Sequence, residues 1–241
     1  RAIAMAKDAP QDKHAGLASV NQLAKQRDSS ELEICDPATE PSPNKLQEQA
    51  EIAESSAMEV VGVSQVSGAS ASYGKYSVFV AASNGFTANY DRSSNSVSCV
   101  AIAGEGSGME RDYDADTRVY QSDLRPSDEI GRAAGLRAVE RLNPRRPATG
   151  NYPVIYDERI SSGLVGHFLS AINGAAITRG SSWLKDSLGE QVLPRTCKLV
   201  ENPHRVRTGA SRLFDSEGLT TKTREILSKG VLNGWTLDLA S

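Results

Sequence analysis

Residues 152–193, YPVIYDERISSGLVGHFLSAINGAAITRGSSWLKDSLGEQVL, carry the clearest structural pattern in the chain. The apolar residues 153–156 predict a short buried strand. Asp157 can then cap a helix and favours its positive N-terminal end. Apolar residues recur every four positions from Ile160 to Ile172, which predicts a helix over residues 158–177. A Gly-Ser-Ser loop follows this helix at 180–182.

The other faces of this helix are unusually small, and glycine recurs on them. Each glycine in a helix interior costs roughly 1 kcal/mol relative to alanine. Such glycines therefore indicate either close backbone packing, which we consider the commoner cause, or space kept for a ligand. Under the second hypothesis, the residues that line the ligand cavity are Gly163, Gly166, His167, Ser170, Gly174, Gly180, Ser181 and Ser182.

Two further helices and an antiparallel sheet are predicted before residue 143. Ser42-Pro43-Asn44 begins the first helix, whose narrow apolar stripe is Leu46, Ala50, Ala53 and Ala57. Between residues 59 and 120 apolar residues recur with period two, and Asn84-Gly85 is typical of a tight hairpin. Ser127 is a candidate N-cap for the second helix, whose stripe is Ile130, Ala134, Ala138 and Leu142.

The segment NPRRPATG, residues 143–150, contains two prolines and a glycine and predicts an extended joint. We place a domain boundary here, with an N-terminal α+β domain over residues 1–147. The first part of a β-rich C-terminal domain follows over residues 148–241, with further strands expected at 198–200 and 231–239. The predicted fold class is therefore α+β, with the N-terminal helices packed on an antiparallel sheet. Because the sequence starts at Arg1 and ends within a strand-like run, we expect a fragment of a longer chain.

Composition excludes several classes of function. The net charge of −3 offers no general attraction for nucleic acid. No apolar run approaches the roughly 18 residues that a membrane span needs, so we expect neither a nucleic-acid partner nor a membrane. The three cysteines, Cys35, Cys99 and Cys197, lie far apart and lack the spacing of a disulfide framework or a cysteine zinc site. We therefore expect a reducing compartment, most simply the cytoplasm.

Several motifs resemble one known family. They are CDPATEP at 35–41, SNGF at 83–86, AGEGSGMERDYD at 103–114, NPRRPATG at 143–150 and RLFDSEGL at 212–219. Together with the helix at 158–177 they resemble, in order and over nearly the whole chain, the TldD/PmbA family. These are the "modulator of DNA gyrase" proteins, whose catalytic branch contains metallopeptidases.

The resemblance also identifies what this chain lacks. Members of the catalytic branch carry His-Glu-x-x-x-His on this helix, where the histidines bind the metal and the glutamate serves as general base. Aligned on the Gly-Ser-Ser loop, the histidines would fall at Val165 and Ser170 and the glutamate at Gly166. None of the three can ligate a metal or activate water. His167 is the only histidine on the helix, and His14 and His204 lie in other segments, so we predict no catalytic residue, no metal ligand and no cofactor in this chain.

The helix pattern resembles the PmbA branch, also called TldE, whose members pair with a catalytic TldD subunit. The resemblance implies a non-catalytic subunit of a cytoplasmic heterodimer, which admits unfolded peptides to a zinc site in the TldD-like partner. A homodimer in isolation is an alternative assembly. Two other functions stay open: a stand-alone metallopeptidase completed by further C-terminal sequence, and a non-proteolytic regulator of gyrase or of a toxin–antitoxin pair.

The remaining patterns have simpler explanations. Gly104–Gly108 follows a strand as a dinucleotide-binding turn would, but no helix pattern follows it, which favours a loop. Ser182-Trp183-Leu184-Lys185 lacks the companion motifs of penicillin-recognising enzymes. The acids of residues 105–116 could form a carboxylate pair only if the fold brings them together. The basic residues of 204–207 with Arg212, and Arg145-Arg146, predict solvated charge or a surface that faces a partner or a peptide carboxylate.

Overall fold

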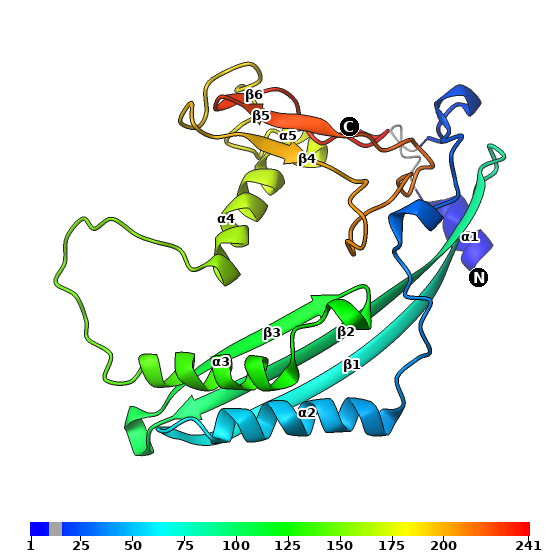
Figure 1. Cartoon of the computed structure of the whole chain (residues 1–241). Coiled ribbons are helices and arrows are strands. Elements are labelled where there is room, and N and C mark those ends of the chain that lie inside the picture. The colour runs from blue at the N-terminus through cyan, green and yellow to red at the C-terminus, as the bar shows by residue number, and fades with distance from the viewer. Residues whose placement is uncertain (10–15) are drawn as a thin grey trace.

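The computed structural model describes residues 1–9 and 16–241 of the chain, so His14 lies outside the described residues. Its α-helices are α1 (Ala2–Asp8), α2 (Pro43–Met58), α3 (Ser127–Glu140), α4 (Glu158–Ala171) and α5 (Gly174–Thr178). The strands are β1 (Val63–Ala81), β2 (Thr87–Ala103), β3 (Glu110–Arg118), β4 (Leu199–Glu201), β5 (Arg224–Ser228) and β6 (Val231–Leu232). Short 3-10 turns are η1 (Val20–Gln22), η2 (Ser30–Leu32), η3 (Gly106–Gly108) and η4 (Gln121–Asp123). The α+β prediction is confirmed (Figure 1).

The largest element is a long, curved antiparallel sheet in the order β1-β2-β3 (Figure 1). The predicted hairpin at Asn84-Gly85 joins β1 to β2, and the N–H of Ala82 donates to the carbonyl of Phe86 at 2.9 Å. Gly85 adopts φ 86°, a backbone conformation that favours glycine. The Asn84 side chain accepts the N–H of Phe86 at 3.1 Å. The turn therefore favours asparagine at position 84 and glycine at position 85.

One face of this sheet is covered by α2 and α3, and here the structure is densely packed. Alternate residues of β2 are fully buried against the alanine stripes of the two helices; the buried members of this core are Ala53, Ala57, Val97, Cys99, Ala101, Ala103, Ile130, Ala134 and Ala138. A Cβ at Gly131 would lie 1.9 Å from the carbonyl oxygen of Ala53. The backbones of α2 and α3 therefore touch, which explains why small residues form the stripes of both helices.

The opposite face of the sheet carries small hydroxyl side chains. The hydroxyls of Ser70 and Ser98 lie 2.9 Å apart across β1 and β2, and those of Ser96 and Thr117 lie 3.0 Å apart across β2 and β3. Figure 1 shows the C-terminal elements standing over this face. We call it the open face, because α2 and α3 cover only the other one.

The C-terminal elements form a small core of their own. The short sheet β4-β5-β6 packs on the C-terminal end of α4, and the buried members are Phe168, Ala171, Ile172, Leu184, Ile226, Leu227 and Leu232. The earlier turns of α4 project away from this core toward the long sheet (Figure 1).

The N-terminal segment packs against distant parts of the chain. Leu23 pairs with Leu219 in an isolated bridge, and the N–H of Ala24 donates to the carbonyl of Gly218 at 2.8 Å. Phe86 and Phe214 meet edge to face with ring centroids 5.3 Å apart. The SNGF and RLFDSEGL motifs therefore meet at the hairpin end of the sheet. The domain boundary at residue 148 stays a prediction.

Several expected boundaries are wrong. Residues 153–156 form no strand, and the side chain of Ile155 is 97% exposed, because no described strand pairs with this segment. The helix over 158–177 is two helices, since Asn173 interrupts it and caps α5 by accepting the N–H of Ala175 at 3.1 Å. Helix α3 begins at Ser127, with Pro126 as its N-cap. The strand expected at 231–239 ends at Leu232, and β5 was not predicted.

Candidate functional site around helix α4

Helix α4 begins at a cap and is anchored to the long sheet at its first turn. The carboxylate of Asp157 accepts the backbone N–H of Arg159 at 3.0 Å. The guanidinium of Arg159 then reaches Asp112 on β3 at 2.8 Å, donates to the carbonyl of Tyr113 at 2.8 Å and stacks over the Tyr113 ring. Between this anchor and the C-terminal core, the helix makes few contacts.

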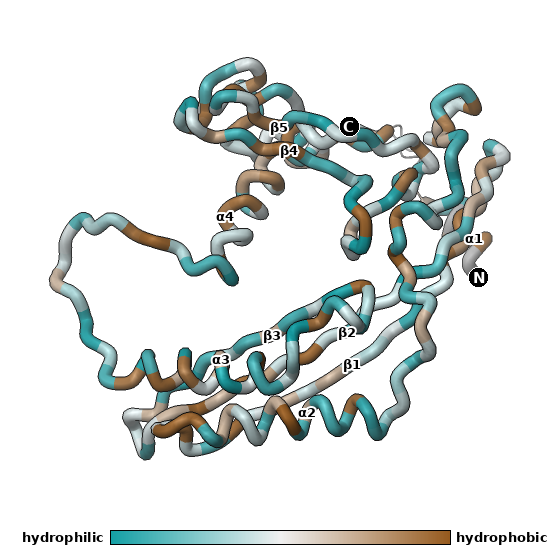
Figure 2. The backbone as a smooth tube through the Cα atoms, in the orientation of Figure 1, coloured by the Kyte–Doolittle hydropathy of each residue, from teal (hydrophilic) through white to brown (hydrophobic). Residues whose placement is uncertain are grey.

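The exposed turns of α4 are apolar. The side chains of Ile160, Leu164 and Val165 are 56%, 49% and 42% exposed, whereas Phe168 is buried in the C-terminal core. Figure 2 shows hydrophobic stretches along α4 where it stands over the long sheet. Contiguous exposed apolar surface of this kind commonly marks a site for a partner or a ligand.

The glycines predicted to line a cavity differ in their surroundings. A Cβ at Gly163 or Gly166 would meet no atom within 4 Å beyond the local helix backbone, so neither glycine serves close packing in this structure. Gly174 does, because its Cβ would lie 3.1 Å from a methyl carbon of Leu237 and closer still to Ser241. Gly180 adopts φ 68° in the turn after α5, with open space around it.

The other predicted lining residues also separate into two groups. His167, Ser170 and Ser181 are exposed, and Ser170 donates its hydroxyl to the carbonyl of Gly166 at 2.9 Å. Ser182 is buried; its hydroxyl donates to the carbonyl of Ala171 and accepts the N–H of Leu184 at 3.0 Å. Ser182 therefore ties the Gly-Ser-Ser loop to the end of α4. Its hydroxyl is thus used by two contacts within the fold.

Two grooves run along α4. The larger, about 660 Å³, is mainly apolar and is lined by residues that include Leu164, Val165, His167, Phe168, Trp183 and Cys197. The second, about 500 Å³, lies beside Val165, Leu169, Ser170 and Asn173 and reaches Ile226 of β5. Val165 borders both grooves. Extended apolar segments are the class of ligand that such surfaces accommodate.

The donor set at α4 does not fit a catalytic metal. Val165, Gly166 and Ser170 occupy the positions where the resemblance places two histidines and a glutamate. His167 and Cys197 line the same groove, but zinc needs at least three protein ligands. Among residues 1–9 and 16–241, no three His, Cys, Asp or Glu side chains are grouped to hold a metal ion.

Three acids of residues 105–116, namely Asp112, Asp114 and Asp116, pair with arginines. Asp112 and Asp114 point from β3 toward α3, where Arg141 and Arg137 meet them, and Arg125 also pairs with Asp114. Burial by itself raises the pKa of Asp112, yet hydrogen bonds and charge from Arg159 hold it below its usual range. Asp112 and Asp114 are both paired with arginines, so these carboxylates attach α3 and α4 to the sheet.

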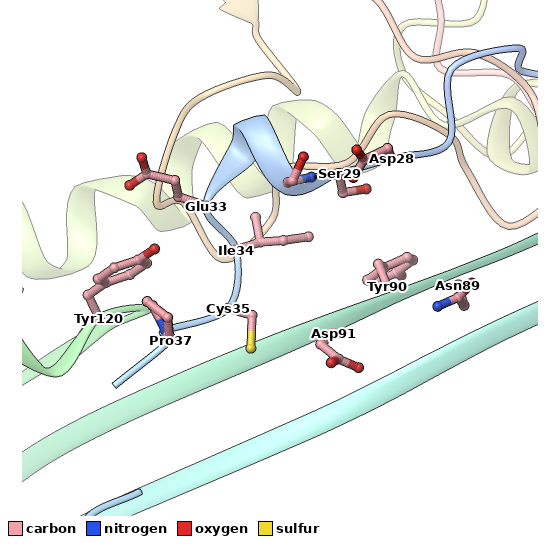
Figure 3. A pocket seen from close by; sticks show the side chains of 11 residues that line it. Asp28, Ser29, Glu33, Ile34, Cys35, Pro37, Asn89, Tyr90, Asp91 and Tyr120 are labelled. Atoms are coloured by element: carbon pink, nitrogen blue, oxygen red, sulfur yellow. Dashed lines mark hydrogen bonds between the residues drawn. The ribbon is translucent and has the colours of Figure 1, made fainter. Parts of the chain in front are cut away.

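A second pocket lies at the N-terminal segment. It measures about 400 Å³. Figure 3 shows the Cys35 side chain pointing from this segment toward β2, which carries Asp91. The neighbouring Asp36 is buried and accepts the backbone N–H groups of Ala38 and Gln121, both at 2.9 Å. The CDPATEP motif therefore fastens the segment to the end of β3. Sequence reasoning missed the pocket, although the motif marked its position.

Comparisons with known proteins agree on the family. The PmbA/TldA metallopeptidase central domain matches residues 35–142, and the PmbA/TldA metallopeptidase C-terminal domain matches residues 149–241. "Metalloprotease PmbA" of Escherichia coli O157:H7 is 36% identical over 238 residues, which are 98% of this chain and 52% of that protein. A "Metalloprotease PmbA homolog" of Haemophilus influenzae is 38% identical over 150 residues, 62% of this chain and 33% of that protein. The chain thus spans about half the length of the first relative, and its match covers a third of the second.

Solved structures support the same assignment. A proposed modulator of DNA gyrase from Bacteroides thetaiotaomicron superposes with a TM-score of 0.91 at 28% identity, over 99% of this chain and 55% of that one. TldE from Thermococcus kodakarensis has a TM-score of 0.72 at 17% identity, over 98% of this chain and 52% of that one, and shows the shared fold. None of the described helices has the length and apolar character to cross a membrane. From its sequence, its domains and its fold, the chain belongs to the PmbA/TldD family.

Proposed function

We propose that this chain is part of a non-catalytic, PmbA-like subunit of a TldD-type zinc metalloprotease that processes unfolded peptides. One observation carries the proposal: α4 presents apolar side chains and two unpacked glycines over the open face of the sheet, without metal ligands at the expected positions. The exposure supports a site that receives a ligand, and the residue types at those positions support a subunit that does not itself perform hydrolysis.

The proposed role is to complete a chamber in a cytoplasmic heterodimer and to hold extended peptide. The grooves on α4 offer apolar contact, and the missing side chains at Gly163 and Gly166 leave room for a peptide backbone to approach. The zinc and the general base would belong to the TldD-like partner. The protease names of the relatives describe those longer proteins, and support the family's chemistry without assigning a catalytic residue here.

The test is cleavage of an unstructured peptide by the complex of the full-length protein with a TldD-type catalytic subunit. Gly166→Leu fills the open space above α4, so we expect it to lower kcat/KM at least tenfold or to weaken pairing. Gly166→Ala adds only a methyl group and serves as the matched small variant. Arg132→Leu adds an exposed leucine on α3, away from the open face, and controls for surface hydrophobicity.

Unchanged pairing and cleavage with Gly166→Leu would overturn the lining role of α4. Cleavage by the protein without any partner would instead establish a stand-alone peptidase. Binding of a gyrase or antitoxin client, with no effect on cleavage by the complex, would establish the regulatory alternative.

A further inference from the structure

We propose that a basic pocket on the open face binds a carboxylate group of the extended peptide. The pocket lies between β2, β3 and the loop 203–212, and measures about 410 Å³. Its residues include four arginines, Arg92, Arg118, Arg205 and Arg207, together with the hydroxyl residues Ser94, Thr117 and Thr208. None of the described residues that line it is acidic. This inference rests on the proposed function, to which it adds a class of substrate.

The loop that forms one wall is held in place by backbone contacts. The N–H of Arg212 donates to the carbonyl of Pro203 at 2.9 Å and closes the base of the loop. From β2, the guanidinium of Arg92 donates to the carbonyls of Gly209 and, at 2.8 Å, Ser211. Ser211 is 1% exposed, so the loop is seated firmly on the open face.

Arg207 is positioned by an unusual backbone and by a network of contacts. It adopts φ 53°, which is uncommon for a residue with a side chain, and its N–H donates to the carbonyl of Leu32 at 2.9 Å. Its guanidinium pairs with Glu33 and Asp123 and lies 3.9 Å from the ring centroid of Tyr120. Arg207 therefore forms part of the pocket wall, but its charge is already balanced by these two carboxylates.

The unbalanced positive charge comes from Arg92 and Arg205. Among the described residues, Arg92 contacts neutral carbonyl oxygens and the Tyr90 ring, which leave its charge uncompensated. Arg205 is exposed and forms no ion pair with any described carboxylate. Arg118, by contrast, pairs with Asp116 at 3.0 Å. Two guanidinium groups beside hydroxyl donors suit a carboxylate, whose two oxygens accept paired N–H bonds.

The pocket also lies at a useful distance from α4. Tyr113 on β3 contacts Arg159 at the foot of α4, and Thr117 on the same strand lines the pocket. Four residues of strand span about 13 Å at roughly 3.3 Å per residue. An extended peptide of about four residues could therefore contact α4 and place a carboxylate in the pocket. That carboxylate is either the C-terminus of the peptide or an Asp or Glu side chain.

The two sources are separated by a set of labelled, unstructured peptides, with binding to the purified chain measured by fluorescence anisotropy. One peptide lacks acidic residues and has a free C-terminus, its partner is amidated, and a third is amidated but carries one internal glutamate. We expect at least one carboxylate-bearing peptide to bind roughly tenfold tighter than the amidated peptide without acids. Tighter binding of the first assigns the terminus, and of the third the side chain.

The decisive variant is Arg205→Gln, which removes one uncompensated charge and no described ion pair. It should reduce the preference for carboxylate several-fold, whereas Arg145→Gln, an equal charge change in the linker, should not. The proposal is overturned if all three peptides bind with equal affinity or if none binds detectably. It is also overturned if both variants lose the preference for carboxylate equally. The same holds if inorganic phosphate displaces the peptides while all three bind with the same affinity. Cleavage by the complex with its TldD-type partner would survive such a failure, which separates it from failure of the proposed function.

Discussion

Helices α3 and α4 both contain two closely spaced glycines, yet the glycines do opposite things. In α3, Gly131 and Gly135 face α2, where a Cβ would lie 1.9 Å from the carbonyl oxygen of Ala53 and 3.0 Å from that of Ala57, respectively. In α4, Gly163 and Gly166 face open space. The same residue pattern therefore reports dense packing in one helix and an unoccupied surface in the other. Only the surroundings, which are set by tertiary structure, distinguish the two.

The difference extends to how the helices are attached. Helix α3 buries Ile130, Ala134 and Ala138 against the long sheet, whereas most of α4 is exposed and its first turn depends on Arg159. We infer that α3 serves the stability of the fold and that α4 serves contact with other molecules. Substitutions in the two helices should separate these roles.

The largest effect is expected for Gly131→Ala. The new methyl group has no room beside the Ala53 carbonyl, so the α2 and α3 backbones must move apart. We expect a loss of about 3 kcal/mol or more in the free energy of unfolding, because overpacking of a backbone contact is not relieved by rotating a side chain. Urea denaturation followed by circular dichroism measures it. A loss below about 1 kcal/mol would mean that the helices are not in backbone contact.

An intermediate effect is expected for Arg159→Gln, which removes the ion pair between α4 and β3. The Arg159 side chain is 20% exposed and that of Asp112 8%, so at neutral pH we expect a cost of about 1–2 kcal/mol. Because the folded state holds the pKa of Asp112 below its usual value of 3.8, this contribution is fully present above about pH 5. It is lost as the pH falls through the lower, folded-state pKa.

Urea titrations of wild type and Arg159→Gln between pH 7 and pH 2 measure this dependence. The difference between them should be constant above about pH 5 and shrink in acid. A difference that grows on acidification would contradict the ion pair as the anchor of α4.

The smallest effect is expected for Gly166→Ala. Alanine is favoured over glycine in a helix interior by roughly 1 kcal/mol, and nothing obstructs the methyl group. Stability should therefore rise by up to about 1 kcal/mol, the opposite sign to Gly131→Ala, in the same denaturation assay. Destabilisation would show that α4 packs against something in solution that fills this space.

The sequence predicted the packed region better than the exposed one. Ala53, Ala57 and the alanines of α3 lie where their spacing placed them, because a buried stripe imposes a strict period. The strand predicted at the apolar residues 153–156 is wrong. An apolar pattern indicates hydrophobicity but does not show whether a partner strand exists. Asn173 broke the expected long helix because its side chain caps the next one, a local bond that a hydrophobic pattern does not reveal.

The candidate sites show the same limit. The sequence predicted eight residues that line a cavity, and two of them, Ser182 and Gly174, have structural contacts that only the folded chain displays. Arg205 and Arg207 were noticed as a basic patch. Arg92, more than 100 residues away, joins them only because β2 runs beneath the loop, a contact that sequence spacing cannot indicate.

The most direct test of the central claim is the zinc content of the full-length protein, purified alone under mild conditions and measured by elemental analysis. Zinc sites require at least three protein ligands, and α4 carries Val165, Gly166 and Ser170 where ligands would be needed. We therefore expect less than about a tenth of an equivalent of zinc. Near-stoichiometric zinc, lost on mutation of residues outside α4, would show that the protein is a metalloenzyme in its own right and contradict its role as a non-catalytic subunit.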